Sequence, residues 1–131
     1  MKTNRRTFLK TLGAAGIFSI VPRHVLGGKG YIPPSDQLTK GIIGVGGIGT
    51  SSYHFTSDKA CKLVAVCDVD KNHLNRAVDM AKKRFNEDVA SYHDFRDLVK
   101  DPNVDVVHVA TPPHWHALMA VEAAKAGKDI W

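Results

Sequence analysis

Short apolar runs alternate with amphipathic stretches along most of the chain, from about residue 38 onward. The runs are rich in Val and Ile and are apolar at successive positions. This pattern is typical of strands buried on both faces of a parallel sheet. Strands are expected at 41–45, 63–67, 89–91 and 104–110, with a fifth strand beginning at 129.

The stretches between these runs have helical spacing. Helices are expected over 47–57, 72–84, 94–99 and 113–126. Asp94 can cap the third of them, and Gly127 stands just past the end of the fourth, where glycine is favoured. Because strands alternate with helices and crossovers are right-handed, the pattern predicts an α/β fold: a Rossmann-like, doubly wound parallel sheet with helices on both faces.

The charge of the chain is concentrated at its start. The 131 residues carry a formal net charge of +5, with 18 Lys and Arg against 13 Asp and Glu. Residues 1–28 hold five of the basic residues and no acidic one, so residues 29–131 carry 13 of each sign. A neutral body gives no support for a nucleic-acid partner, which would need a basic surface.

The first residues have the features of a targeting segment. Arg5 and Arg6 stand before Thr-Phe-Leu-Lys, and residues 11–21 are apolar but too few to span a bilayer. The segment resembles a twin-arginine export signal. We therefore expect a signal over 1–28, a Gly/Pro-rich linker over 29–38 and the folded domain over 39–131.

This resemblance implies a location and a partner. The protein is expected to use the twin-arginine export machinery and to act in the periplasm or another extracytoplasmic space. No clear A-x-A cleavage site follows the apolar stretch, so anchoring to the membrane by an uncleaved signal stays an alternative.

Cys61 and Cys67 stand at the two ends of one expected strand. Six residues of strand separate their Cα atoms by roughly 20 Å, and a disulfide requires less than about 7 Å. Both are therefore expected to be free thiols that behave as small buried apolar residues. Free thiols fit a protein that folds in the reducing cytoplasm before export.

A glycine motif follows the first expected strand. Residues 44–49 read G-x-G-x-x-G, with Gly47 and Ile48 between its last two glycines. Gly44 would permit a tight turn, Gly46 a close approach of the backbone to a pyrophosphate, and Gly49 close packing of the following helix. An anion at the start of that helix would meet free N–H groups, so the motif predicts a dinucleotide site.

Asp68 ends the second expected strand, 19 residues after Gly49. A carboxylate at this place accepts hydrogen bonds from the adenosine ribose hydroxyls. It would also repel a 2′-phosphate, so NAD is expected rather than NADP, although Lys71 would soften that repulsion. Asp70 is expected to point elsewhere or to lie in the following loop.

The fourth expected strand ends in Ala-Thr-Pro-Pro-His-Trp-His, residues 110–116. Together with 43–49, 64–70 and 123–128, this segment is similar to the N-terminal domain of the Gfo/Idh/MocA oxidoreductases. The resemblance covers residues 38–131. It implies that Thr111 and Pro112 run along the cofactor and that His116 lies near the nicotinamide and the substrate, as an auxiliary catalytic residue.

The same resemblance implies that much of the catalytic machinery is missing. The family carries a Glu-Lys-Pro motif with its usual catalytic Lys just after the fifth strand, and this chain ends at Trp131. The C-terminal α/β substrate domain would be missing as well. The chain is thus expected to be a truncated, marginally stable fragment that binds NAD weakly or not at all and turns over nothing.

The remaining aromatic and imidazole side chains have weaker claims. Trp115 either lines the substrate pocket or simply packs, and both alternatives stay open. His114 and His116 are two residues apart and do not share a helix face, so no metal site is expected. His108 is expected to be a core histidine. No role is expected for three others: His54, His73 and His93.

Three functions remain open for the full-length protein. The first is an NAD(P)-dependent oxidoreductase that acts on a sugar or polyol. The second is an NAD-dependent glycoside hydrolase, which oxidises its sugar transiently and then reduces it again. The third is a dinucleotide-binding module without catalysis. The full-length protein is expected to form a homo-oligomer.

Overall fold

The computed structural model describes residues 32–33 and 36–131. The expected export signal over 1–28 lies outside the described residues, as does half of the expected linker over 29–38. Residues 36–131 belong to one compact unit. Within the described residues, no helix is long and apolar enough to cross a bilayer.

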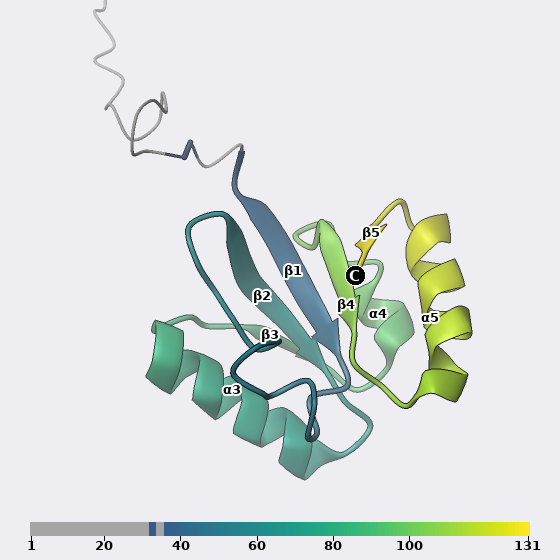
Figure 1. Ribbon diagram of the computed structural model, residues 1–131, viewed down its shortest axis with the longest axis horizontal. Helices are drawn as coiled ribbons and strands as arrows, with labels where there is room; N and C mark the ends of the chain where they lie inside the picture. Colours follow the sequence, from purple (N-terminus) through teal and green to yellow (C-terminus); the bar gives the residue numbers. More distant parts are fainter. Residues whose placement is uncertain (1–31, 34–35) are drawn as a thin grey trace, which may run out of the picture. The chain divides into compact units, whose positions relative to one another are not determined.

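The centre of this unit is a five-stranded parallel sheet (Figure 1). Its strands are Leu38–Ile43 (β1), Cys61–Cys67 (β2), Ala90–Tyr92 (β3), Val106–Val109 (β4) and Asp129–Ile130 (β5). They are arranged in the order β3-β2-β1-β4-β5, so the chain runs outward from β1 first in one direction and then in the other. This order confirms the predicted doubly wound sheet.

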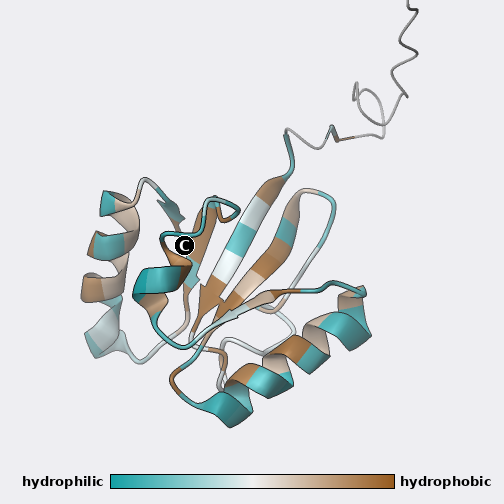
Figure 2. Cartoon of the chain, turned by 180° about the vertical axis from the view of Figure 1, so that it is seen from behind, coloured by the Kyte–Doolittle hydropathy of each residue, from teal (hydrophilic) through white to brown (hydrophobic). Residues whose placement is uncertain are grey.

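Helices cover both faces of the sheet. They are Lys71–Phe85 (α3), Phe95–Leu98 (α4) and Pro113–Lys125 (α5). Figure 2 shows apolar residues along the strands and alternating apolar and polar residues along α3. The α3 face buries Ile42, Val45, Phe55, Leu63, Val66, Leu74, Ala77 and Ala81. The opposite face buries Ile43, Ala65, Cys67, Phe95, Leu98, Val99, Val104, Val107, Met119 and Ala123.

Side-chain caps begin α3 and α4. The Asp70 carboxylate accepts hydrogen bonds from the N–H groups of Asn72 at 2.7 Å and His73 at 3.3 Å. Asp94 accepts from the N–H of Arg96 at 2.9 Å, which confirms its predicted capping role. Asp70 is therefore the N-cap residue of α3, in the segment that follows β2.

The end of α5 has the predicted glycine. Gly127 adopts a left-handed conformation with φ 73°, and its N–H donates to Ala124 O at 3.0 Å. The N–H of Lys128 donates to Ala123 O, also at 3.0 Å. These two bonds form a Schellman motif, which ends the helix and directs the chain into β5.

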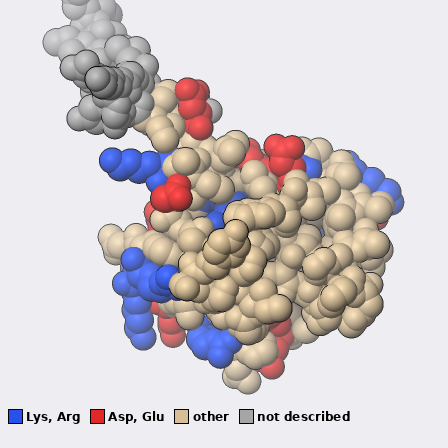
Figure 3. All heavy atoms as spheres, viewed as in Figure 1, with Lys and Arg blue, Asp and Glu red and all other residues tan. Residues whose placement is uncertain are grey.

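The outer side of α5 is unusually apolar. Only Met119 and Ala123 of this helix are buried, whereas Trp115, Leu118 and Val121 are 42–51% exposed. These three residues are spaced by three along one side of the helix. Figure 3 shows a largely uncharged surface toward the first turns of α5. The helix is therefore attached to the sheet by few side chains.

A buried carboxylate connects β3, the turn before β4 and the segment after α5. Asp101 is 9% exposed. It accepts hydrogen bonds from the Tyr92 hydroxyl at 2.9 Å and from the N–H of Asn103 at 2.8 Å. The Lys128 ammonium donates to the main-chain oxygens of Asp101 and Val104 at 2.8 and 2.7 Å. These bonds satisfy polar groups that would otherwise be costly to bury.

The two cysteines stand at the ends of β2 and are both free, as predicted. Cys67 is 2% exposed, and burial raises the pKa of its thiol to about 12. Cys61 is only partly buried, so the expectation of two fully buried thiols is correct for Cys67 alone.

The helix expected over 47–57 is wrong, because this segment forms turns. Its bonds include Ser51 N–H to Ile48 O at 2.9 Å and Phe55 N–H to Ser51 O at 2.8 Å. Residues 50–58 contain Thr, Ser, Tyr, His, Phe and Asp and none of the strong helix formers. Ser and Thr side chains also compete for backbone groups, which disfavours a helix interior.

Candidate functional site

A cleft of about 1080 Å³ opens at the carboxyl ends of the strands. Ligands bind at this edge in doubly wound sheets, beside the strand where the winding direction changes. Almost all of the predicted site residues line the cleft, with Gly49 the exception. Those that do are Gly44, Gly46, Gly47, Ile48, Asp68, Thr111, Pro112, Trp115 and His116. Their individual roles stay predictions.

Gly44 makes the tight turn at the end of β1. Its φ is +89°, a conformation that L side chains rarely adopt. A Cβ at this position would also lie 2.9 Å from Thr111 Cγ2 and 3.0 Å from the main-chain oxygen of Ala110. The turn therefore needs glycine, and it brings the ends of β1 and β4 together.

The other glycines of the motif differ in what they require. A Cβ on Gly49 would lie 1.8 Å from the carbonyl oxygen of Gly44. Close packing is the predicted reason for this glycine, but the contact is made within the loop and not by a following helix. A Cβ on Gly46 would only touch the His73 ring at 3.5 Å, and one on Gly47 would meet nothing within 4 Å. A Cβ could therefore be accommodated at Gly46 and at Gly47.

The loop presents unpartnered backbone donors on the wall of the cleft. Within the described part of the chain, no acceptor receives a hydrogen bond from the N–H of Gly46, Gly47 or Ile48. Successive free N–H groups in a turn form a concave site for an anion. Because no helix follows the loop, these groups act without the dipole of a helix N-terminus.

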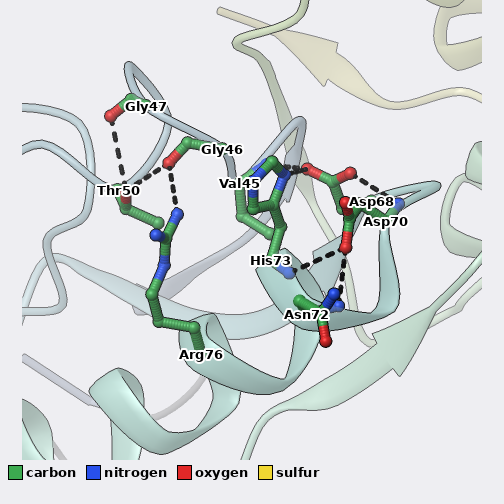
Figure 4. Close-up of polar contacts among 9 residues, drawn as sticks. All are labelled: Val45, Gly46, Gly47, Thr50, Asp68, Asp70, Asn72, His73 and Arg76. Atoms are coloured by element: carbon green, nitrogen blue, oxygen red, sulfur yellow. Dashed lines mark hydrogen bonds and ion pairs between the residues drawn. The ribbon is translucent and has the colours of Figure 1, made fainter.

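Asp68 connects the loop to the segment after β2 (Figure 4). Its Oδ2 accepts from the N–H of Val45 and its Oδ1 from the N–H of Asp70, both at 2.9 Å. The side chain is 10% exposed, and Oδ2 lies 3.8 Å from Nδ1 of His73. A carboxylate oxygen can accept more than one bond, so Asp68 can still bind a ligand hydroxyl at the cleft.

Two residues of α3 contact this region, although the sequence analysis gave them no role. His73 lines the cleft beside Asp68. The Arg76 guanidinium donates to the carbonyl oxygen of Gly46 at 3.1 Å. A sequence signal does exist, because these residues stand three and six positions after the Asp70 cap and so share one side of the helix.

The segment after β4 forms the other wall. The Nε2 atom of His116 lies 2.6 Å from the carbonyl oxygen of Thr111, which fixes the orientation of the imidazole ring. Trp115 lines the cleft and is 45% exposed, and its role in substrate binding stays a prediction. His114 does not line the cleft.

A buried polar cluster lies near the cleft on the α3 face of the sheet. His108 is 4% exposed, which confirms a core histidine. Its ring centroid lies 4.9 Å from that of His54 and 4.7 Å from that of Trp131. Burial, together with smaller effects of the nearby His54 and Lys40, lowers the pKa of His108 to about 4. This imidazole is therefore neutral at pH 7.

Lys40 is the third member of the cluster and is only 1% exposed. Its ammonium donates to the Thr56 hydroxyl at 2.7 Å and to the main-chain oxygen of His54 at 3.4 Å. Burial lowers the pKa of Lys40. His54 and His93 line the cleft as well, and the sequence analysis missed them both. Among the described residues, no group of three or more His, Cys, Asp or Glu side chains could hold a metal ion.

Comparison with solved structures gives the same fold. A probable dehydrogenase from Thermotoga maritima is 31% identical, with a TM-score of 0.59 over 71% of this chain and 27% of that chain. The scyllo-inositol dehydrogenase from Lactobacillus casei, solved with bound NAD(H) and scyllo-inositol, is 27% identical, with a TM-score of 0.60 over 72% of this chain and 27% of that chain.

Comparison with curated proteins gives relatives at similar identity. A glycosyl hydrolase family 109 protein from Shewanella pealeana is 32% identical over 100% of this chain and 33% of its own length. The chain thus spans about a third of the length of this relative. The model of the oxidoreductase family with an NAD-binding Rossmann fold matches residues 38–131. The chain belongs to the Gfo/Idh/MocA oxidoreductases, and residues 38–131 are their NAD-binding Rossmann domain.

Proposed function

We propose that the cleft binds NAD for hydride transfer to or from a sugar or polyol in the full-length protein. The observation that carries this proposal is the set of three free N–H groups, on Gly46, Gly47 and Ile48, next to the Asp68 carboxylate. The amides suit the diphosphate, which is anionic. The carboxylate suits the vicinal hydroxyls of a ribose.

The proposed position of NAD follows from this pairing. The adenosine ribose would lie at Asp68, the diphosphate at the glycine loop, and the nicotinamide toward Thr111 and His116 at the opposite wall. Because a 2′-phosphate would approach the Asp68 carboxylate, we propose NAD and not NADP as the cofactor. The scyllo-inositol dehydrogenase from Lactobacillus casei, solved with NAD(H) and an inositol, supports both the cofactor and the substrate class.

The chemistry would be shared between the cofactor and the protein. Bound NAD supplies the hydride acceptor. The contact between His116 Nε2 and Thr111 O would hold the imidazole ring where it can assist proton transfer at the substrate. The main acid or base is proposed to be a Lys of the full-length protein beyond Trp131.

The experiment compares Asp68→Ala with the full-length parent for NAD and NADP. We expect the variant to lose most of its preference for NAD, since the ribose loses its acceptor and the 2′-phosphate loses the charge that repels it. Asp79→Ala removes an exposed carboxylate of α3 and serves as the matched control. An unchanged preference in Asp68→Ala would remove the role proposed for this residue.

A second candidate function is favoured by the curated relatives named glycosyl hydrolase family 109. Such an enzyme would oxidise its glycoside with bound NAD and reduce the product again, so that no net NADH accumulates. Absorbance at 340 nm with substrate and NAD distinguishes the two reactions. A steady rise supports the dehydrogenase, whereas glycoside cleavage without a rise supports the hydrolase. A full-length protein that binds NAD and does neither would be a binding module.

We also propose export by the twin-arginine route, with function in the periplasm or another extracytoplasmic space. The support is the Arg5-Arg6 pair and the apolar stretch over 11–21. Changing both arginines to lysine should keep a reporter fused to residues 1–38 in the cytoplasm. Continued export of that reporter would exclude the route, and the size of the exported product would show whether the signal is cleaved.

A further inference from the structure

The glycine loop is held by side chains in a place where a helix was expected. Residues 47–57 form turns, so no regular ladder of i→i−4 hydrogen bonds fixes the peptides that follow Gly46. Two side chains donate to the Gly46 carbonyl oxygen instead (Figure 4). Arg76 reaches it from α3 at 3.1 Å, and the Thr50 hydroxyl reaches it from within the loop.

The direction of the Gly46 carbonyl determines the direction of the Gly47 N–H. Gly46 C=O and Gly47 N–H belong to one planar trans peptide, in which the two groups point to opposite sides. Since Arg76 draws the oxygen toward α3, the N–H of Gly47 must point away from α3. This N–H is one of the three free donors on residues that line the cleft.

We infer that Arg76 is a positioning residue for the cofactor diphosphate: it holds the Gly46–Gly47 peptide so that the Gly47 N–H faces the anion. This inference rests on the proposed function. The Thr50 hydroxyl donates to the same carbonyl oxygen. Gly46 and Gly47 have room around their Cα atoms and glycine has few conformational restrictions, so this peptide depends on its hydrogen bonds for its orientation.

Arg76 also contributes charge. Among the described residues, no carboxylate lies within ion-pair distance of its guanidinium. Its positive charge therefore remains beside a loop that lacks the dipole of a following helix. A purely structural role, in which Arg76 only attaches the loop to α3, predicts a general loss of stability. Positioning predicts a loss confined to ligands that carry a diphosphate.

The test compares ligands with and without the diphosphate on the full-length protein. Calorimetric titrations with NAD, ADP-ribose and adenosine are made on the parent protein, Arg76→Ala and Arg76→Lys. Lys83→Ala is the matched control, because it removes one exposed positive charge from the same helix. We expect Arg76→Ala to weaken NAD and ADP-ribose about fivefold, as for the loss of one hydrogen bond, and to leave adenosine within about twofold.

Arg76→Lys should recover part of the lost affinity, and Lys83→Ala should bind all three ligands like the parent protein. Equal weakening of NAD and adenosine by Arg76→Ala, or no weakening of either, would overturn the inference. A loss of the same size in Lys83→Ala would also overturn it, because net charge alone would then explain the effect.

A second measurement separates this inference from the proposed function. Backbone ¹⁵N relaxation of Gly46 and Gly47 in the ligand-free protein should show lower order parameters in Arg76→Ala than in the parent. Unchanged order parameters would overturn the positioning role even if NAD binds. If NAD does not bind to the parent protein, the proposed function fails, while the relaxation data still decide whether Arg76 orders the loop.

Discussion

Replacing Gly49 by alanine would place a methyl group into the tightest contact of the glycine loop. The new Cβ would lie 1.8 Å from the carbonyl oxygen of Gly44, a separation that must grow to at least 3.0 Å. Neither partner can give way easily. Gly44 is itself held at φ +89° against Ala110 and Thr111, and both atoms are attached to backbone.

The expected cost is at the upper end of the range for overpacking, about 3 kcal/mol. For a domain of this size such a loss lowers the melting temperature by roughly 10–20 °C. Gly47→Ala is the matched control, because its Cβ meets nothing within 4 Å. It should stay within about 0.5 kcal/mol of the parent chain.

Urea denaturation of the three proteins, followed by far-ultraviolet circular dichroism, measures the difference. Gly49→Ala should shift the midpoint downward without changing the slope, and Gly47→Ala should leave the midpoint unchanged. Equal midpoints for the two variants would refute the argument that the Gly49–Gly44 contact is obligatory. NAD affinity gives an independent comparison, since Gly47→Ala adds a methyl group at the wall of the cleft.

Three further outcomes follow from buried groups. The pKa of His108 is lowered to about 4, so the unfolded chain binds more protons than the folded chain between about pH 4 and 6.5. Stability should then fall by on the order of 3 kcal/mol as the pH drops through this window, and His108→Leu should remove this dependence in urea midpoints; parallel curves would contradict it. Asp101→Ala should lower the free energy of unfolding by about 2 kcal/mol at pH 7, since Tyr92 and Asn103 lose their charged acceptor. Because these partners lower the pKa of the Asp101 carboxyl, its contribution is present above about pH 4 and is lost as the pH falls further; equal stability of variant and parent at pH 7 would contradict the argument. Burial raises the pKa of Cys67 to about 12, so iodoacetamide at pH 8 should leave it unmodified until the chain unfolds, which mass spectrometry of labelled peptides would detect.

Much of the fold can be predicted from local patterns in the sequence. The doubly wound parallel sheet, the caps at Asp94 and Gly127 and the glycine turn at Gly44 follow from periodicity or from the conformation of one residue, and all of them are confirmed. The helix expected over 47–57 is wrong, because the Ser, Thr and aromatic residues of that segment have little helix propensity.

The site is harder to predict from the sequence, because its contacts join segments that are far apart along the chain. Arg76 meets Gly46 across 30 positions of sequence, and His54 meets His108 from a distant part of the chain. The spacing of Arg76 from the Asp70 cap places it on the same side of α3 as His73, but nothing local in the sequence shows that this side faces Gly46, and His54 has no local signal for its contact with His108. Asp68 could be predicted, because its place at the end of a strand and its spacing from the glycines are both local.

Few buried side chains attach α5 to the sheet, so the wall of the cleft that includes α5 should be less stable than the wall formed by the glycine loop. With Met119 and Ala123 as its only buried residues, α5 should open at a lower free energy than β1 and β2, which lie inside the sheet. Amide hydrogen exchange would then proceed first in α5. A cofactor bound as proposed could lose its nicotinamide contacts in such an opening while its adenosine remained on Asp68, so release would begin from the nicotinamide end.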